Sequence, residues 1–251
     1  MSHARLRRHT LMTHFASGPD LSRVTVASGQ HNRRRGAKCV SPARYTRAVT
    51  DGRVGVQRHN TEKRIADAAV HLFALQGFSA TGIRQIADDA NVATSALYYY
   101  APNKNALLLK VMMTGLTELL SSGRAAMDDS IGPKESIRGL VRVHVTFGTS
   151  NPERARVIDN EVQWLSDPDR TSVMALRDKY ELLWSQSITD GVNSGEFWVR
   201  DKRLARLALL EMCNGAAHWY RPEGSLTISH IVDVFQDMAL ALLHYRLIAG
   251  R

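Results

Sequence analysis

Apolar residues recur three to four positions apart along most of the chain after residue 58, which is the spacing of one face of an α-helix. This pattern predicts helices over residues 60–76, 81–90, 93–100, 104–122, 136–147, 152–165, 167–191, 204–220 and 228–243. We expect a loop or a frayed helix end over residues 123–133. The segment 204–220 is apolar nearly all round, which predicts burial at the centre of its domain. The fold class is therefore predicted to be all-α.

Residues with strong positional preferences mark the ends of the first helices. Asn60 or Thr61 can cap the first helix, and Gly77 is a good stop after it. Thr81 is expected to cap the second helix. Asn91 stands where the chain must turn sharply, and asparagine tolerates the left-handed conformation better than most residues. Three short helices joined by tight turns are therefore expected between residues 60 and 100.

Such an arrangement suggests a helix-turn-helix, whose second helix lies in the major groove of DNA. Small polar residues begin that helix, and tyrosines follow that offer hydroxyls to phosphates and rings for packing. We expect Tyr98 to be mostly core and Tyr99 to contact DNA. Residues at helix N-termini are further candidates, because backbone N–H groups there favour phosphate. The predicted DNA contacts are Thr61, Thr81, Arg84, Thr94, Ser95, Tyr98, Tyr99 and Lys104.

Residues 61–108 resemble the DNA-binding domain of TetR-family transcription regulators. The matching residues are Thr61, Arg64, Ile65, Phe73, Gly77, Phe78, Thr81, Ile86, Ala87, Ala90, Val92, Leu97, Tyr98, Tyr99, Tyr100, Lys104 and Leu107. Three positions depart from the family pattern: Asn91 replaces a glycine, Ala93 a serine cap, and Ala101 an aromatic residue. The resemblance implies a three-helix DNA-binding domain over residues 59–106 and a helical ligand-binding and dimerisation domain over residues 107–251.

The formal net charge of +9 comes from the N-terminal tail. Residues 1–58 hold twelve of the 33 basic residues and only two of the 24 acidic ones, so the remainder is almost neutral. This segment lacks a sustained helical or strand period, and we expect it to be disordered. It is a phosphate-contacting arm, through Arg33, Arg34 and Arg35, a solvated tail, or sequence upstream of the true start.

The two C-terminal helices carry enough apolar surface for a four-helix interface between two subunits. The alternative is an ordinary core within one subunit. Dimerisation suits a helix-turn-helix protein, because a dimer reads two half-sites about 34–36 Å apart. The residues predicted for the interface are Ile231, Phe235, Met238 and Leu242.

The stretches 177–184, 191–197 and 218–226 resemble a subgroup of actinobacterial repressors that sense acyl-CoA or steroid-degradation thioesters. The resemblance implies a long apolar tunnel with a polar mouth. Candidates for its wall are Trp164, Met174, Tyr180, Trp184, Met212 and Trp219, some of which are expected to be plain core. Glu211 and Asn214 either orient a ligand or satisfy each other. Arg142, Arg154 and Arg156 either bind a CoA phosphate or form a solvated face.

Several classes of function lack their sequence signals. The chain has no Gly-rich phosphate loop, no nucleophile elbow and no metalloprotease motif, and its histidines have no metal-ligand spacing. His144, His218 and His244 lie on apolar helices, where a satisfied core or interface histidine is expected. Cys39 and Cys213 fit a reduced, cytoplasmic protein. No apolar run reaches the ~18 residues of a membrane span.

The sequence thus predicts a cytoplasmic homodimeric repressor without a cofactor. It would bind a palindromic operator in double-stranded DNA and be released by a small hydrophobic or acyl-CoA-type effector. The alternative is a helical acyl-CoA-handling enzyme or carrier with an accessory DNA-binding head. A protein that coats nucleic acid nonspecifically is disfavoured by the nearly neutral body.

Overall fold

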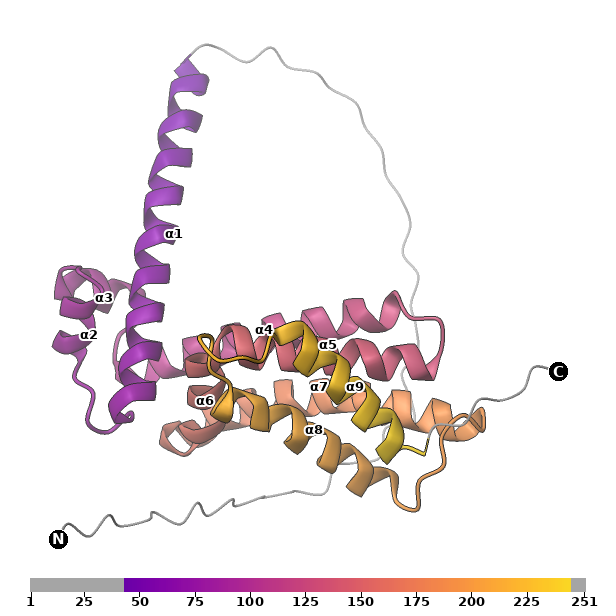
Figure 1. The fold of residues 1–251 in the computed structure, drawn as a ribbon. Helices are drawn as coiled ribbons and strands as arrows, with labels where there is room; N and C mark the ends of the chain where they lie inside the picture. The colour runs from indigo at the N-terminus through magenta and orange to yellow at the C-terminus, as the bar shows by residue number, and fades with distance from the viewer. Residues whose placement is uncertain (1–42, 245–251) are drawn as a thin grey trace, which may run out of the picture. The chain divides into compact units, whose positions relative to one another are not determined.

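The computed structural model describes residues 43–244, with side chains from residue 59 onward, and this part consists of helices and their connections (Figure 1). The elements are α1 (Ala43–Gln76), α2 (Ile83–Asp89), α3 (Thr94–Tyr100), α4 (Lys104–Asp128), α5 (Pro133–Ser150), α6 (Pro152–Asn160), the 3₁₀ helix η1 (Val162–Trp164), α7 (Asp167–Asn193), α8 (Lys202–Trp219) and α9 (Ile228–Leu242). No strand occurs among these residues, which confirms the all-α prediction.

The chain divides into two compact units, Met1–Thr46 and Arg47–Arg251. Of the first unit, only residues 43–46 at the start of α1 are described. The predicted tail therefore lies largely outside the described residues, but its last part, residues 43–58, continues α1 upstream. The predicted start at Asn60 or Thr61 is wrong. The sequence of α1 contains no proline, and a capping residue inside an otherwise permissive stretch does not by itself end a helix.

Helix α4 extends past its predicted end, because Gly123 serves for close packing and not as a stop. The glycine is buried, and a Cβ on it would lie 2.9 Å from Cε2 of Tyr180 and 3.0 Å from Cδ1 of Leu183. The missing side chain lets α4 approach α7 at this level. The predicted loop over residues 123–133 is accordingly confined to the short connection after Asp128.

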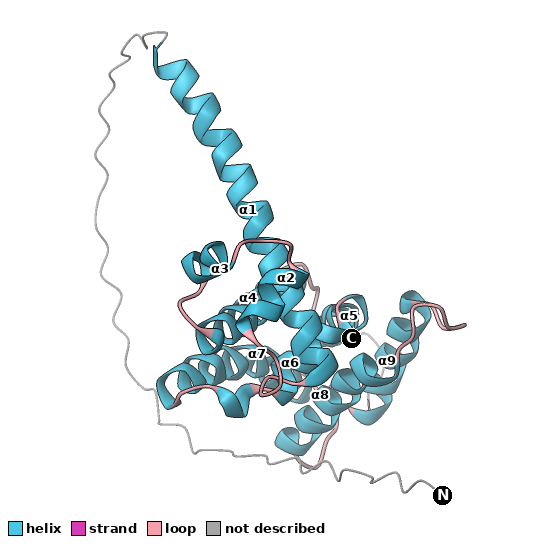
Figure 2. Ribbon diagram, turned by 90° about the vertical axis from the view of Figure 1, so that its left-hand side faces the viewer, coloured by secondary structure: helices cyan, strands magenta, loops and turns pink. Residues whose placement is uncertain are grey.

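Two hydrophobic cores organise the described chain. One joins α1, α2 and α3 to the first half of α4 and to residues of α6 and α7. Figure 2 shows α2 and α3 beside the C-terminal half of α1. The other core lies between the second half of α4 and helices α5, α7, α8 and α9. Helix α5 contacts all four of these helices, and it is therefore the central element of the C-terminal domain.

Helix α8 was predicted to be buried all round, and this is wrong. Leu209, Cys213 and Ala216 face the core, whereas the Leu204 side chain is 62% exposed and Trp219 44% exposed. Helix α8 therefore has two apolar faces, one packed in the core and the other at the surface. Among the described residues, only one of these faces is covered.

A buried histidine lies in the core of the C-terminal domain. His144 on α5 is only 7% exposed, and its Nε2 lies 2.7 Å from Oδ1 of Asn214 on α8. Burial lowers the pKa of His144 to about 4, against the opposing effect of this hydrogen bond. The imidazole is therefore neutral near pH 7.

Acid should destabilise the fold through His144. The unfolded chain takes up a proton near its usual pKa of about 6.5, whereas the folded chain resists protonation until about pH 4. The unfolded state thus binds more protons in this window, and the free energy of unfolding should fall by up to about 3 kcal/mol as the pH falls through it.

The measurement is urea unfolding at a series of pH values for the wild type and the His144→Gln variant. The variant should lose less stability between these pH values than the wild type. His230→Gln, which changes an exposed histidine on α9, is the control and should follow the wild type. Equal pH dependence of the wild type and His144→Gln would contradict the assignment.

Candidate DNA-binding and effector-binding sites

The turn between α2 and α3 is held by a cation from α1. Asn91 has φ of 49°, which confirms the predicted left-handed turn. Arg64 donates hydrogen bonds from Nη2 to the carbonyl oxygens of Ala90 and Asn91, so its guanidinium stabilises the turn. Ala93 is the N-cap of α3, and it has no hydroxyl with which to cap the helix. Arg64 was assigned no role from the sequence, because only the folded turn brings these carbonyls to it.

A second cation fixes the turn between α1 and α2. Nζ of Lys104, the first residue of α4, lies 2.7 Å from the carbonyl oxygens of both Phe78 and Thr81 and 4.3 Å from the centre of the Phe78 ring. Burial lowers the pKa of Lys104. The ammonium is hydrogen-bonded to the protein backbone, and its predicted contact with DNA stays a prediction.

Thr81 is likewise a structural residue. Its side chain is 2% exposed, and its hydroxyl donates to the carbonyl of Gly77 at 2.9 Å. Gly82 is the N-cap of α2, so the predicted cap at Thr81 is wrong. Thr61, predicted to lie at a helix start, is half-buried inside α1. Neither position offers a helix N-terminus to phosphate.

The remaining predicted contacts are accessible on α2 and α3. Tyr99 is 75% exposed and Tyr98 52% exposed, so the expectation that Tyr98 is mostly core is wrong. Ser95 and Arg84 are exposed, and Thr94 is half-buried at the start of α3. These five residues therefore stay predictions for DNA contact. Tyr100 is the packing tyrosine: it is half-buried, and Nζ of Lys110 lies 3.5 Å from the centre of its ring.

Trp164 connects the head to the C-terminal domain and does not line the core. Its ring stacks on Phe78 with centroids 5.8 Å apart and an interplanar angle of 28°. Its carbonyl accepts a hydrogen bond of 2.6 Å from Nδ2 of Asn105 near the start of α4. The Glu161 carboxylate accepts a hydrogen bond from the backbone N–H of Phe78. The prediction that Trp164 forms a ligand wall is wrong, because η1 places it against the turn between α1 and α2.

Three of the predicted ligand residues do meet in the C-terminal core, around His144. Tyr180 is 3% exposed and Trp184 is fully buried, and Asn214 is hydrogen-bonded to the histidine. His144 was expected to be a satisfied core residue. Only one of its ring nitrogens has a partner among the described residues.

The other candidates lie elsewhere. Met174 and Met212 are half-buried, Glu211 is exposed, and the Trp219 ring lies 6.2 Å from that of Phe235 at the surface of α8 and α9. The arginines proposed for a CoA phosphate are also dispersed. Arg142 is exposed, Arg154 pairs with Glu118 at 2.8 Å, and Arg156 donates to the Ala217 carbonyl at 3.3 Å.

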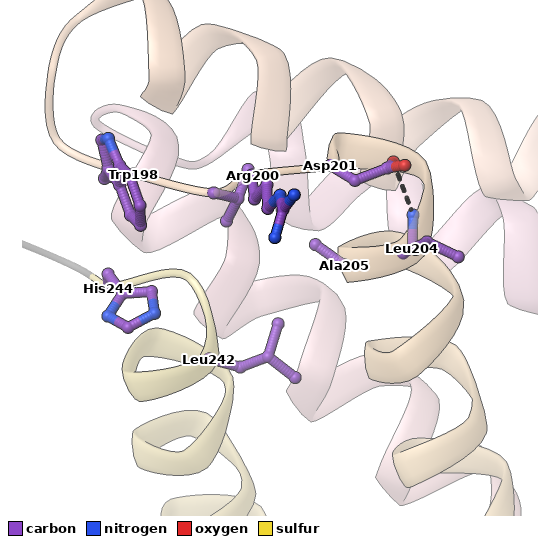
Figure 3. Close-up of a pocket in the computed structure, with 8 residues that line it drawn as sticks. Trp198, Arg200, Asp201, Leu204, Ala205, Leu242 and His244 are labelled. Carbon is purple, nitrogen blue, oxygen red and sulfur yellow. Dashed lines mark hydrogen bonds between the residues drawn. The ribbon is translucent and has the colours of Figure 1, made fainter.

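A pocket of about 500 Å³ lies at the connection between α7 and α8 and at the end of α9 (Figure 3). Its lining is Trp198, Val199, Arg200, Asp201, Leu204, Ala205, Leu242 and His244. None of the predicted ligand residues lines it. Trp198 and His244 pack edge to face with centroids 5.7 Å apart, and the backbone N–H of Trp198 donates to the Leu243 carbonyl at 3.0 Å.

The predicted interface residues divide between the core and the surface. Ile231 is 3% exposed and belongs to the core of its own subunit, so its predicted place in an interface is wrong. Phe235 and Leu242 are half-buried against that core. Met238 is 52% exposed, as the interface prediction requires.

The described residues contain neither a candidate metal site nor a candidate membrane span. No group of three or more histidine, cysteine, aspartate and glutamate side chains between residues 59 and 244 is placed to hold a metal ion. None of the described helices has both the length and the apolar character to cross a membrane.

Comparison with known proteins identifies two family domains. Residues 65–111 match the model of bacterial regulatory proteins of the TetR family. Residues 130–243 match the model of the tetracycline-repressor-like C-terminal domain. The first match covers the head described above, and the second covers α5 to α9.

Individual relatives agree with this assignment. The transcriptional repressor KstR2 of Rhodococcus jostii is 26% identical over 178 residues, which cover 70% of this chain and 87% of that protein. A TetR-family regulator from Rhodococcus RHA1 has a similar structure, with a TM-score of 0.69, 24% identity and coverage of 74% and 98% of the two chains. AibR, solved with isovaleryl coenzyme A and operator DNA, has a TM-score of 0.65, 22% identity and coverage of 71% and 97%. The chain belongs to the TetR family of transcription regulators.

Proposed function

We propose that this protein is a ligand-responsive repressor that binds a palindromic operator as a homodimer and is released by a small hydrophobic or acyl-CoA-type effector. The observation that carries the proposal is the exposed polar face of α3, held by Arg64 and Lys104 on a helical domain with a buried aromatic core. KstR2 is a repressor, and AibR was solved with both an acyl-CoA and operator DNA. Both support the same function here.

DNA recognition uses α3 as the helix in the major groove. Thr94 and Ser95 at its N-terminal end meet base edges or nearby phosphates, and the Tyr99 hydroxyl reaches the backbone. Arg84 supplies the one predicted guanidinium contact, from α2. Few of these side chains form bidentate pairs with bases, so sequence-dependent DNA shape contributes to the choice of operator.

Dimerisation uses the uncovered faces of α8 and α9. Leu204 and Trp219 on α8 and Met238 on α9 are exposed large apolar side chains. Two such faces related by a two-fold axis bury one another and place two heads for half-sites one turn of DNA apart. Burial of these side chains in a dimer explains why such large apolar residues are exposed on the single subunit.

Effector binding changes DNA affinity only if the effector prefers one of two arrangements of the heads. Trp164 and Glu161 contact the turn at Phe78, and they thereby link the C-terminal domain to the DNA-binding head. A conformational change near η1 therefore alters the position of α2 and α3. Each tenfold loss of operator affinity requires about 1.4 kcal/mol of coupling free energy.

The proposal is tested by selecting binding sites from random DNA with the purified protein. We expect the selected sequences to contain an inverted repeat bound by one dimer. In the Thr94→Ala and Tyr99→Ala variants, operator affinity should fall by at least about tenfold, because each change removes a contact to DNA. Electrophoretic mobility shifts measure it. Unchanged affinity in both variants would remove α3 from the DNA interface, and selection of unrelated sequences would overturn specific recognition.

Replacing Met238 with glutamate should yield monomers. The side chain is exposed in the subunit, so the charge is tolerated when the subunit is alone, but in the dimer it would be buried without a partner. Sedimentation velocity measures the mass. Asp233→Asn, an exposed change on the same helix, is the control and should leave the dimer intact. A dimeric Met238→Glu protein would show that α9 does not form the interface.

Replacing Trp164 with alanine should loosen the turn between α1 and α2. The change removes the stack on Phe78 and should leave the core around Trp184 intact. Hydrogen exchange measured by mass spectrometry should be faster in peptides that contain residues 77–82 and unchanged in peptides from α7. Trp198→Ala, an exposed tryptophan in the C-terminal domain, is the control. Equal exchange rates in the wild type and Trp164→Ala would show that Trp164 does not hold the turn between α1 and α2.

A further inference from the structure

The pocket at the connection between α7 and α8 has no role in the proposed function. Its volume of about 500 Å³ lies within the range of small-molecule sites, about 300–1,000 Å³. Leu204, Ala205 and Leu242 give it apolar walls, and Trp198 and Arg200 add an aromatic ring and a guanidinium. An apolar cavity with a few polar groups is the usual composition of a site for a small organic ligand.

Backbone hydrogen bonds fix the wall that the connection between α7 and α8 forms. The N–H of Phe197 donates to the Gly191 carbonyl at 2.8 Å, and the N–H of Trp198 donates to the Leu243 carbonyl at 3.0 Å. The Phe197 ring is buried in a place that a Cβ on Gly191 would overlap. At its other end the connection is joined to α8 by Asp201, whose side chain caps the helix. The wall is therefore held in shape by the protein alone.

Two aromatic rings form one side of the pocket. The Trp198 side chain is 58% exposed, although Phe197 beside it is buried. His244 has φ of 47°, a left-handed conformation that residues other than glycine adopt rarely, and its ring packs edge to face on Trp198. Both rings line the pocket (Figure 3). Trp198 thus offers a rigid, flat apolar surface to a ligand.

The charged groups of the lining differ in how they are used. The Asp201 carboxylate accepts hydrogen bonds from the backbone N–H groups of Arg203 at 2.8 Å and Leu204 at 3.0 Å, so the N-terminal end of α8 balances its charge. Arg200 makes no hydrogen bond or ion pair with any of the described residues (Figure 3). His244 is the other titratable group of the lining. The guanidinium of Arg200 therefore retains its donors, and their planar arrangement matches a carboxylate.

We propose that this pocket binds a small organic carboxylate with a flat apolar body. The carboxylate pairs with Arg200, and the body packs between the Trp198 ring and Leu242. The largely apolar lining disfavours a multiply charged group, whose hydration would be lost without compensation. This inference goes beyond the proposed function, because none of the residues predicted to bind the effector lines this pocket.

Naphthoate and the neutral naphthamide test the proposal, because they share a flat apolar body and differ in charge. Isothermal titration calorimetry of the full chain near neutral pH should give a dissociation constant for naphthoate about fivefold lower than that for naphthamide. This ratio is the scale of an ion pair that is open to water. Equal affinity for the two probes, or no binding of naphthoate, would overturn the proposal.

Variants of the lining locate the bound anion. Arg200→Gln should raise the dissociation constant of naphthoate about fivefold and leave that of naphthamide unchanged, because only the ion pair is lost. Trp198→Ala should weaken the binding of both probes, because both lose the same apolar surface. Lys202→Gln removes an exposed positive charge beside the pocket and outside its lining; it is the matched control and should bind both probes as the wild type does. Equal naphthoate affinity of the wild type and Arg200→Gln would place the anion elsewhere and reject the site.

Two other occupants of the pocket are distinguished by the same titration. Naphthoate binding by a chain that ends at His244, but not by the full chain, would assign the pocket to residues 245–251. Binding by the Met238→Glu variant, but not by the wild type, would assign it to a second copy of the chain. Either result would contradict the proposal, which expects the full chain and Met238→Glu to bind naphthoate alike.

Discussion

The position of the DNA-binding head depends on the ammonium group of Lys104. This residue is the first of α4. Its Nζ donates hydrogen bonds to the carbonyl oxygens of Phe78 and Thr81 in the turn between α1 and α2. The same helix continues into the C-terminal core, where Leu119 and Leu120 are buried. One helix thus begins at the head and ends in the core of the C-terminal domain. A partly desolvated cation bonded to two carbonyls fixes the joint more strictly than apolar packing would, because hydrogen bonds to a charged donor are directional and strong.

Arg64 does for the second turn what Lys104 does for the first. Both cations are hydrogen-bonded to backbone carbonyls of the turns. Neither residue lies on α2 or α3, which together contain one basic residue. That residue is Arg84, while the tyrosines and small hydroxyl residues of α3 provide uncharged contacts. Affinity that relies on few ionic contacts should depend weakly on salt, since each phosphate neutralised by a cation adds to the salt dependence.

The sequence was sufficient where structure is set by neighbours along the chain. Gly77 and Asn91 adopt the left-handed turns that their residue types favour, and α3 lies within one residue of its predicted start. It was insufficient where a distant contact decides. Helical periodicity shows that Ile231 or Trp164 faces something apolar, but the same pattern fits a core, an interface or a joint. Gly123 likewise reads as a stop until the approach of α7 is known. Site residues therefore could be named as candidates, but their roles required the fold.

The aromatic cluster around His144 shows the same distinction in energetic terms. From the sequence, Tyr180 and Trp184 are a stripe on one helix and His144 is a lone histidine on another. Only the packing of α5 against α7 reveals that the three rings meet in the core, where burial lowers the pKa of His144 and raises that of Tyr180. Polar rings cost more free energy to bury than apolar side chains of the same volume unless each polar atom is hydrogen-bonded. A buried neutral histidine also makes the stability of the domain depend on pH, which an apolar side chain in place of His144 would not do.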